Sequence, residues 1–258
     1  MAIRFGPAGI GAVKDVDSTF SSYHRLGISA AEVPFTYSVY IKSEKEGKIV
    51  GEAARKNGIR LSVHAPYFVN LNSMERKKVE DSKKRILDSC RAASWMGAEV
   101  VVFHCGFYGK MDRETCYQNI KKEILGLLEE VKKNKWEVKL APETMGKVNV
   151  FGSVDEILRL VKETGCSFCL DFAHLTARSQ GKMSYGEMYE YVEKFSSLHC
   201  HFSGIAFSEK GERHHTLTDK RELKELISAL PKNKEIVIIN ESPDPVGGSV
   251  LALEIYLK

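Results

Sequence analysis

The chain alternates short apolar segments with longer amphipathic segments from end to end. Eight apolar or β-branched runs recur, near Ile3–Phe5, Ala30–Val33, Ile59–Val63, Glu99–Phe103, Val138–Leu140, Ser167–Leu170, Leu198–Phe202 and Glu235–Ile239. Several of these runs are apolar almost throughout, which is typical of parallel strands that are buried on both faces. The alternation therefore predicts a parallel β-sheet whose strands are joined by helices.

The segments between the runs carry the signals that begin and end helices. Ser153 and Ser184 are each followed three residues later by a glutamate, the pattern of a capping box. The expected N-caps are Ser73, Asp112, Ser153 and Ser184, and the expected stops are Gly97, Gly165 and Pro231.

Eight strand–helix units in 258 residues are what a closed (β/α)8 barrel, or TIM barrel, requires. We therefore expect residues 1–258 to form a single barrel domain. The alternative is an open doubly wound sheet, which usually carries a glycine-rich phosphate loop after its first strand. The segment 6–11 is rich in glycine but does not match G-x-G-x-x-G, and no acidic partner follows at the expected distance.

Six of the runs end in a residue type that binds metal ions: His64, His104, Glu143, Asp171, His201 and Glu241. Three more candidates follow in the next loops: His174, Glu212 and His214. In a barrel of this kind the carboxyl ends of the strands meet at one mouth, where the loops converge. The barrel would therefore bring all nine side chains to one cavity.

Nine candidates exceed what a single zinc ion uses, which is about four contacts. Five imidazoles and four carboxylates favour Zn²⁺, with Mn²⁺ or Fe²⁺ as alternatives. Three Zn²⁺ would contribute a charge of about +6, from which the carboxylates subtract about 4. The remaining charge of about +2 suits a phosphodiester that gains charge as it is attacked, whereas a neutral sugar would not need so positive a site.

Two of the nine choices rest on a preference between neighbours. His199 and His201 share a strand face, and we choose His201 because it lies closer to the carboxyl end of the strand. His214 and His215 are adjacent, and we choose His214 because Glu212-x-His214 could chelate one ion.

The bulk properties are those of an ordinary globular protein. The net charge is only +4, no apolar stretch approaches the roughly 18 residues of a membrane span, and the start lacks the apolar region of a signal peptide. We expect a cytoplasmic protein without a membrane segment. The six cysteines show no framework spacing and are expected to be buried free thiols. The lysine-rich runs 76–78 and 132–135 are expected to be solvated faces of helices.

At the candidate residues the sequence resembles the endonuclease IV family of apurinic/apyrimidinic endonucleases, within the xylose isomerase-like barrels. The matching segments are His64-Ala65-Pro66-Tyr67-Phe68-Val69-Asn70-Leu71, Phe103-His104-Cys105-Gly106, Glu143-Thr144-Met145-Gly146-Lys147, Cys169-Leu170-Asp171-Phe172-Ala173-His174, the strand end at His201, Glu212-Arg213-His214 and Glu241-Ser242-Pro243-Asp244. They follow the family order across most of the chain.

The resemblance implies a cluster of three zinc ions that incises DNA on the 5′ side of an abasic site. Glu143 would bridge the first two ions and is the catalytic residue that the resemblance assigns. His64 and His104 would complete the first site, Asp171, His201 and Glu241 the second, and His174, Glu212 and His214 the third. The expected DNA-binding residues are Tyr37, Tyr67, Lys147 and Arg213, and the protein is expected to act as a monomer.

Two departures from the family pattern leave alternatives open. Glu212 stands where the family usually has an aspartate, and the loop 34–40 lacks the polar residues that the family uses to enter the duplex. Tyr37 and Tyr40 in that loop either stack on bases or pack against the protein, and Tyr67 is either a cleft residue or a loop anchor.

Two other functions compete with the nuclease. A sugar isomerase or epimerase of the same superfamily would hold one Mn²⁺ with Glu143, Asp171, His201 and Glu241 alone. A non-catalytic protein that binds damaged nucleic acid would keep the cluster for structure only.

Overall fold

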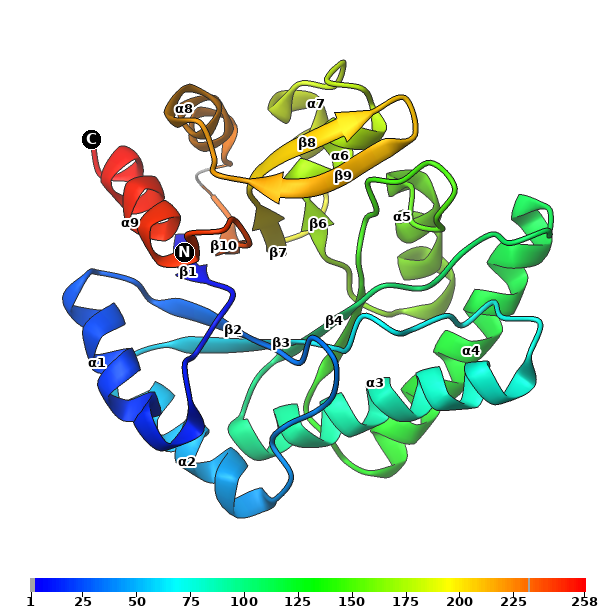
Figure 1. The fold of residues 1–258 in the computed structure, drawn as a ribbon, viewed down its shortest axis with the longest axis horizontal. Helices are drawn as coiled ribbons and strands as arrows, with labels where there is room; N and C mark the ends of the chain where they lie inside the picture. The colour runs from blue at the N-terminus through cyan, green and yellow to red at the C-terminus, as the bar shows by residue number, and fades with distance from the viewer. Residues whose placement is uncertain (1–2, 232) are drawn as a thin grey trace.

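Parallel strands close into a barrel in the computed structural model, which describes residues 3–231 and 233–258 (Figure 1). The barrel strands are β1 (Ile3–Pro7), β2 (Ala30–Pro34), β3 (Arg60–His64), β4 (Val100–Phe103), β5 (Lys139–Pro142), β6 (Leu170–Asp171), β7 (Ser197–Phe202) and β10 (Glu235–Asn240). They pair in the orders β1-β10-β7-β6 and β2-β3-β4-β5. Parallel bridges from Ala8 to Glu32 and from Glu143 to Cys169 join the two sheets. All eight predicted strands are confirmed, and the closed barrel excludes the open sheet.

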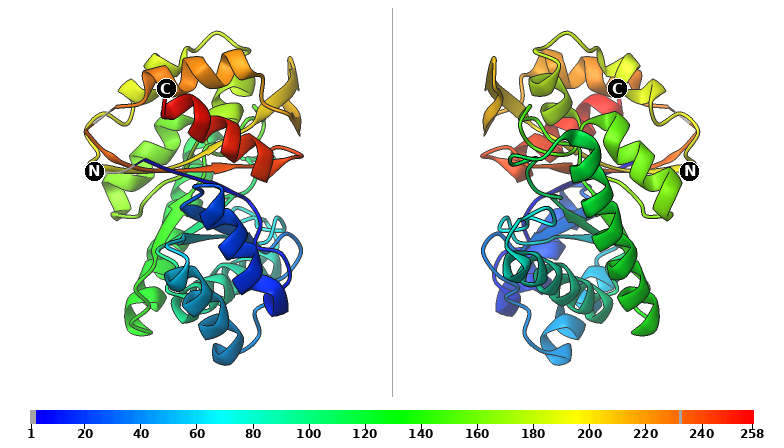
Figure 2. Two further views of the ribbon diagram at one scale, coloured as in Figure 1. Left: turned by 90° about the vertical axis from the view of Figure 1, so that its left-hand side faces the viewer. Right: turned by 90° about the vertical axis from the view of Figure 1, so that its right-hand side faces the viewer.

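Helices surround the strands (Figures 1 and 2). They are α1 (Val16–Arg25), α2 (Glu44–Lys56), α3 (Arg76–Met96), α4 (Arg113–Lys133), α5 (Val154–Thr164), α6 (Phe172–Arg178), α7 (Tyr185–Glu190), α8 (Lys220–Ala229) and α9 (Pro245–Tyr256), with a short 3-10 turn, η1 (Val13–Asp15), before α1.

Most of the expected helix ends are confirmed. Asp112 caps α4, and Ser153 and Ser184 form the capping boxes of α5 and α7. Gly97 and Gly165 follow α3 and α5 in the left-handed conformation, and α8 ends shortly before Pro231. The prediction for Ser73 is wrong, because its hydroxyl accepts a hydrogen bond from the amide of Glu75 and α3 begins only at Arg76.

An antiparallel hairpin, β8 (Gly204–Ser208) with β9 (Gly211–Thr216), follows β7 where the sequence predicted a loop. Gly211 allows the turn with a φ of +89°. The hairpin contacts the loop after β5, where the amide of Glu212 donates to the carbonyl of Gly146 at 3.4 Å. The hairpin lies at the side of the molecule away from the start of β1 (Figure 2). It therefore extends the end of the barrel where the strands finish.

The strand side chains alternate between the helices and the barrel interior. Outward residues such as Phe103, Leu140 and Ile238 belong to the main apolar core under the helices. The inward residues form two small apolar clusters, one of Val102, Ala141 and Cys169 and one of Ala30, Val237 and Ile239. Polar inward residues lie beside these clusters and lead to the mouth of the barrel.

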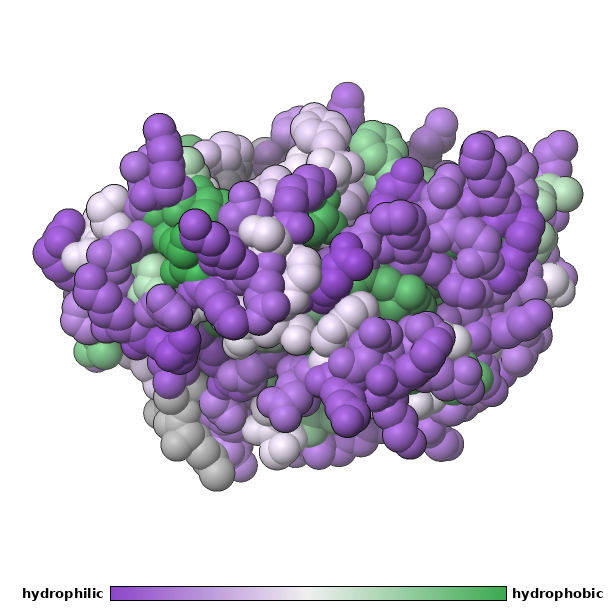
Figure 3. All heavy atoms as spheres, turned by 90° about the horizontal axis from the view of Figure 1, so that it is seen from below, coloured by the Kyte–Doolittle hydropathy of each residue, from purple (hydrophilic) through white to green (hydrophobic). Residues whose placement is uncertain are grey.

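The outer surface carries the expected charged side chains. Residues 76–78 and 132–135 are exposed, which confirms the prediction of solvated helix faces. The face seen from below in Figure 3 is mostly hydrophilic with small apolar patches. The six cysteines are free and buried, as predicted. Among residues 3–231 and 233–258, none of the helices combines the length and apolarity that crossing a membrane requires.

The seam between β1 and β2, where the two sheets meet, leads to a prediction about stability. A Cβ atom on Gly6 would lie 1.8 Å from the carbonyl oxygen of Ala30, whereas a Cβ atom on Gly126 in α4 would meet nothing within 4 Å. We predict that Gly6→Ala lowers the free energy of unfolding by about 2 kcal/mol or more, because the seam must open. Gly126→Ala should raise it by about 0.5–1 kcal/mol. Urea denaturation measures both, and equal effects of the two substitutions would contradict the assignment of Gly6 to the seam.

Candidate metal centre

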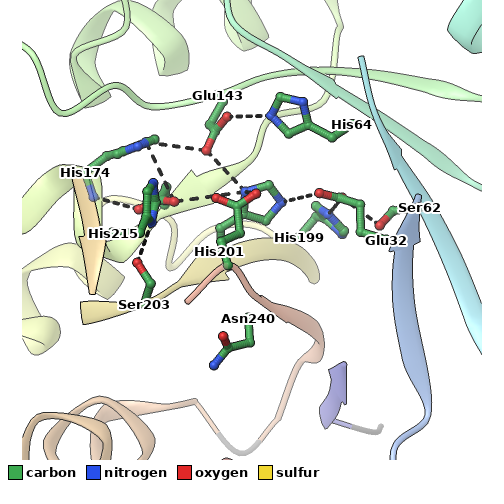
Figure 4. A network of polar contacts seen from close by, with 12 residues as sticks. Glu32, Ser62, His64, Glu143, His174, His199, His201, Ser203, His215 and Asn240 are labelled. Carbon is green, nitrogen blue, oxygen red and sulfur yellow. Dashed lines mark hydrogen bonds and ion pairs between the residues drawn. The ribbon is translucent and has the colours of Figure 1, made fainter. Parts of the chain in front are cut away.

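Glu143 lies at the centre of the mouth, where Figure 4 shows contacts from its carboxylate to His64, His174 and His201. It follows β5 directly and is fully buried. Its Oε2 lies 2.9 Å from His104 Nε2 and 3.2 Å from His64 Nε2. Its Oε1 lies 3.2 Å from His201 Nδ1 and 3.4 Å from His174 Nδ1. One carboxylate therefore touches histidines from the ends of β3, β4 and β7 and from α6, which follows β6.

The ligand-type atoms at the mouth form three groups, and within each group the atoms lie within 4.8 Å of one another. The first group is His64, His104 and Glu143, the second is Glu143, Asp171, His201 and Glu241, and the third is His174, Glu212 and His215. Glu143 belongs to the first two groups. The structure thus brings together eight of the nine predicted residues, in the groups that the family resemblance implied.

His214 is the ninth residue, and the choice of His214 over His215 needs correction. On β9, Glu212 lies opposite Phe207 and His214 opposite Ala206, so Arg213 is an extra, bulged residue without a partner on β8. A bulge shifts the alternation of side chains by one position. Glu212 and His215 therefore face the same side, and the exposed His214 does not join the group.

The choice of His201 over His199 agrees with the geometry. His201 is fully buried, and its Nδ1 lies 3.4 Å from Glu241 and 4.0 Å from Asp171 as well as near Glu143. His199 lies one pleat further from the mouth, and its Nε2 contacts Glu32 at 3.1 Å.

The carbonyl and hydroxyl groups around the mouth hold several of the imidazoles in one orientation. His64 Nδ1 lies 2.8 Å from the carbonyl of Ala65, and His174 Nδ1 lies 2.8 Å from the carbonyl of Thr144. A carbonyl only accepts, so these Nδ1 atoms carry the proton and each Nε2 keeps its lone pair for a cation. Ser203 similarly holds His215 through its Nδ1 at 2.6 Å.

The residues present fit bound cations. Asp171 uses Oδ1 to accept from the amide of His174 at 2.6 Å, at the start of α6. Its Oδ2 and the Oε2 of Glu212 are buried without a hydrogen-bond partner among the described residues. Buried carboxylate oxygens without a hydrogen bond are costly, and a cation in each of the two ligand groups would remove that cost. Nitrogen and oxygen donors in this mixture suit zinc.

Without bound cations, protons on the imidazoles offset the negative charge of the buried carboxylates at the mouth. Burial alone would raise the pKa of Glu143, but the charges of His104 and His201 outweigh burial and hold the pKa well below its usual range. Burial lowers the pKa of His64, but the hydrogen bond and charge of Glu143 outweigh it and raise the pKa to about 9. Metal binding at His64 must therefore displace a proton from this ring.

The rim of the mouth carries the predicted DNA-binding residues, which are exposed. Tyr67 stacks on His104 with ring centres 6.0 Å apart, and 55% of its surface is exposed. Tyr37 is 75% exposed and lies beside Phe68, a rim residue that the sequence analysis did not single out. Lys147 and Arg213 are exposed on the loop after β5 and on β9. Tyr40, by contrast, packs edge-on against Phe35.

Residues 20–256 match the model of the xylose isomerase-like TIM barrel family. The chain belongs to that family. The resemblance seen in the motifs is thus confirmed at the level of this barrel family.

Two proteins of similar sequence carry different names. The chain is 33% identical to an uncharacterised protein of Methanocaldococcus jannaschii over 98% of this chain and 96% of that one. It is 27% identical to a probable endonuclease 4 of Mycobacterium leprae over 75% of this chain and 77% of the relative.

Solved structures of two kinds share the fold. Endonuclease IV of Thermus thermophilus superposes with a TM-score of 0.73 at 19% identity, covering 98% of both chains. D-Psicose 3-epimerase of Clostridium cellulolyticum superposes with a TM-score of 0.68 at 12% identity, covering 99% of this chain and 97% of the other.

The raised pKa of His64 generates a pH prediction. A histidine whose pKa rises from 6.5 to about 9 on folding contributes stability that is complete below pH 6.5 and is lost as the pH rises through 9. Metal-free protein should therefore lose on the order of 2 kcal/mol of stability between pH 6.5 and 9 through this ring. Denaturation after chelator treatment measures the loss, and His64→Asn should show a smaller one. Equal slopes in the two proteins would refute this source of the pH dependence.

The bulge in β9 generates a second prediction. His215→Ala should lower the metal affinity of the third ligand group at least 10-fold, because the substitution removes one of its three ligand residues. His214→Ala changes the adjacent histidine on the opposite face and should leave metal binding unchanged. Competition with a metal chelator measures both affinities. A larger loss in His214→Ala than in His215→Ala would restore the original choice.

Proposed function

We propose that this protein is a zinc-dependent endonuclease that hydrolyses the phosphodiester on the 5′ side of an abasic site in DNA. The main support for the proposal is that three ligand groups converge at one mouth. The first two groups share Glu143, and His174 of the third group lies 3.4 Å from it. The four residues of the second ligand group alone would be enough for a site with one ion. Such a site would not use the first and third ligand groups, yet their atoms also converge at the mouth.

The chain's own residues would position the substrate and the cations. His64, His104 and Glu143 would hold one ion, Asp171, His201 and Glu241 would join Glu143 around a second, and His174, Glu212 and His215 would hold a third. When bound, the ions would supply an activated water and neutralise charge on the phosphate. Glu143 would fix the spacing of the first two positions, because its two oxygens face different imidazoles.

The rim supports a polymeric, anionic substrate. Tyr67 presents a face beside the first ligand group, where it could line a pocket for a sugar without a base. Tyr37 and Phe68 offer exposed aromatic surface on the neighbouring loops, and aromatic faces stack on bases without sequence preference. Lys147 and Arg213 add positive charge for phosphates.

The second candidate function is a sugar epimerase or isomerase that uses one ion, and the observation favouring it is the completeness of the second ligand group. It predicts one tightly bound ion per chain, whereas the endonuclease predicts about three. Metal analysis of protein purified without chelators distinguishes the two functions.

We predict that metal-loaded protein cleaves a duplex with a single abasic site and that Glu143→Gln lowers the rate by about 1,000-fold or more. The substitution removes the charge that the first two ligand groups share. Glu123→Gln is the matched control, because Glu123 is also a buried glutamate but pairs with Arg76 and Lys83 on the outer helices. Gel analysis of the cleaved strand measures the rate. An intact duplex that is nevertheless bound by the metal-loaded protein would reject the hydrolase in favour of a binding protein.

A further inference from the structure

Glu32 is a buried carboxylate inside the barrel that none of the three ligand groups includes. It lies in β2 next to Ser62 of β3, and none of its surface is exposed. Figure 4 shows its side chain on the opposite side of His201 from His174 and His215. Glu32 is the only ionisable residue of its apolar run, Ala30–Val33.

Three groups of the barrel interior surround this carboxylate. The Ser62 hydroxyl donates to Oε2 at 2.7 Å, and His199 Nε2 lies 3.1 Å from the same oxygen. His201 Nε2 lies 3.1 Å from Oε1. Burying an ionised carboxylate costs several kcal/mol unless donors and positive charge surround it. Its neighbours therefore have to present N–H and O–H groups toward it.

This requirement matters most for His201, because both of its nitrogens face carboxylates. Nδ1 points to Glu143 and Glu241, and Nε2 points to Glu32. A neutral imidazole carries one proton, and the nitrogen that binds a cation must be the one without it. A proton on Nε2 would face Glu32 in a close ion-pair contact, which is not an aligned hydrogen bond, and would leave the lone pair of Nδ1 toward the second ligand group.

Two other histidines of the mouth show a similar arrangement with weaker acceptors. His64 and His174 are held at Nδ1 by the carbonyls of Ala65 and Thr144, so each offers Nε2 to a cation. In His201 the two nitrogens have exchanged roles. Nδ1 faces the metal position, and Nε2 faces the carboxylate of Glu32. A carboxylate behind a ligand histidine fixes the proton on that ring and makes the ring a stronger ligand.

We propose that Glu32 is a positioning residue that holds His201 in the Nε2–H form, so that Nδ1 of His201 can bind the second metal ion. This inference rests on the metal centre proposed above and does not depend on the DNA substrate. Ser62 and His199 both hydrogen-bond to the other oxygen of Glu32, Oε2, and neither belongs to the second ligand group.

A competing role for the same residues is a separate metal site deeper in the barrel. Cys169, His199 and His201 also place ligand-type atoms within 4.8 Å of one another. Such a site would use Nε2 of His201 and would add one ion to the total. The positioning role instead requires a proton on that nitrogen.

The test compares Glu32→Ala, Glu32→Gln and the control Glu123→Gln with the wild-type protein. Zinc affinity at each position is measured by competition with a chelator, and the protonated nitrogen of His201 is identified by long-range proton–nitrogen NMR of protein labelled with 15N-histidine. Glu32→Ala should weaken binding at the second position by about 10- to 100-fold and abolish the single Nε2–H form of His201. Glu32→Gln, which keeps a neutral acceptor, should show the same change to a smaller degree, and Glu123→Gln should show neither.

Several results would overturn the proposal. Wild-type affinity together with an unchanged Nε2–H signal in folded Glu32→Ala would do so, as would a zinc-bound Nε2 of His201 in the wild-type protein. If Glu32→Ala does not fold, Glu32→Gln decides, because wild-type affinity and an unchanged signal there would show that the carboxylate is dispensable. Wild-type protein that binds no zinc at all would reject the metal centre itself, whereas normal zinc binding without DNA cleavage would reject only the proposed substrate.

Discussion

The burial of Glu143 is the constraint on which the mouth of this barrel depends. A carboxylate with no exposed surface must be surrounded by positive charge or by hydrogen-bond donors. Four histidines meet this need, and because they arrive from different strands, they can do so only when the barrel is closed. The seam at Gly6 and the bridge from Glu143 to Cys169 are therefore requirements of the site as much as of the fold.

The polar interior behind the mouth extends the same principle. Glu32 is compensated by Ser62, His199 and His201, so His201 connects two buried carboxylates on its opposite edges. The ring protons and any cations at the mouth consequently depend on each other through this one imidazole. The apolar core lies elsewhere, between the outward strand faces and the helices, and leaves the barrel interior available for this polar layer.

Particular residues show where sequence reasoning succeeds and where it stops. Periodicity located all eight barrel strands. Residue type identified six of the nine residues in the three groups at the strand ends and two more in the loops that follow. The error at His214 has a single cause, because the bulge at Arg213 breaks the alternation on which the choice relied. Nothing in the local sequence marks that bulge, which depends on how β9 pairs with β8. Glu32 was missed because a lone carboxylate within an apolar strand acquires a role only through its neighbours from β3 and β7.

The sequence alone determined the number and order of the strand–helix units, and with them the barrel and the convergence of the strand ends. Those properties follow from hydrophobic periodicity and helix capping, which act over a few residues and can be read locally. The tertiary structure decided which of two adjacent histidines faces the third group, which nitrogen of each ring is free, and which carboxylate lies behind His201. These features depend on distances between atoms of strands far apart in the chain, which are fixed only when the barrel closes and its interior is packed.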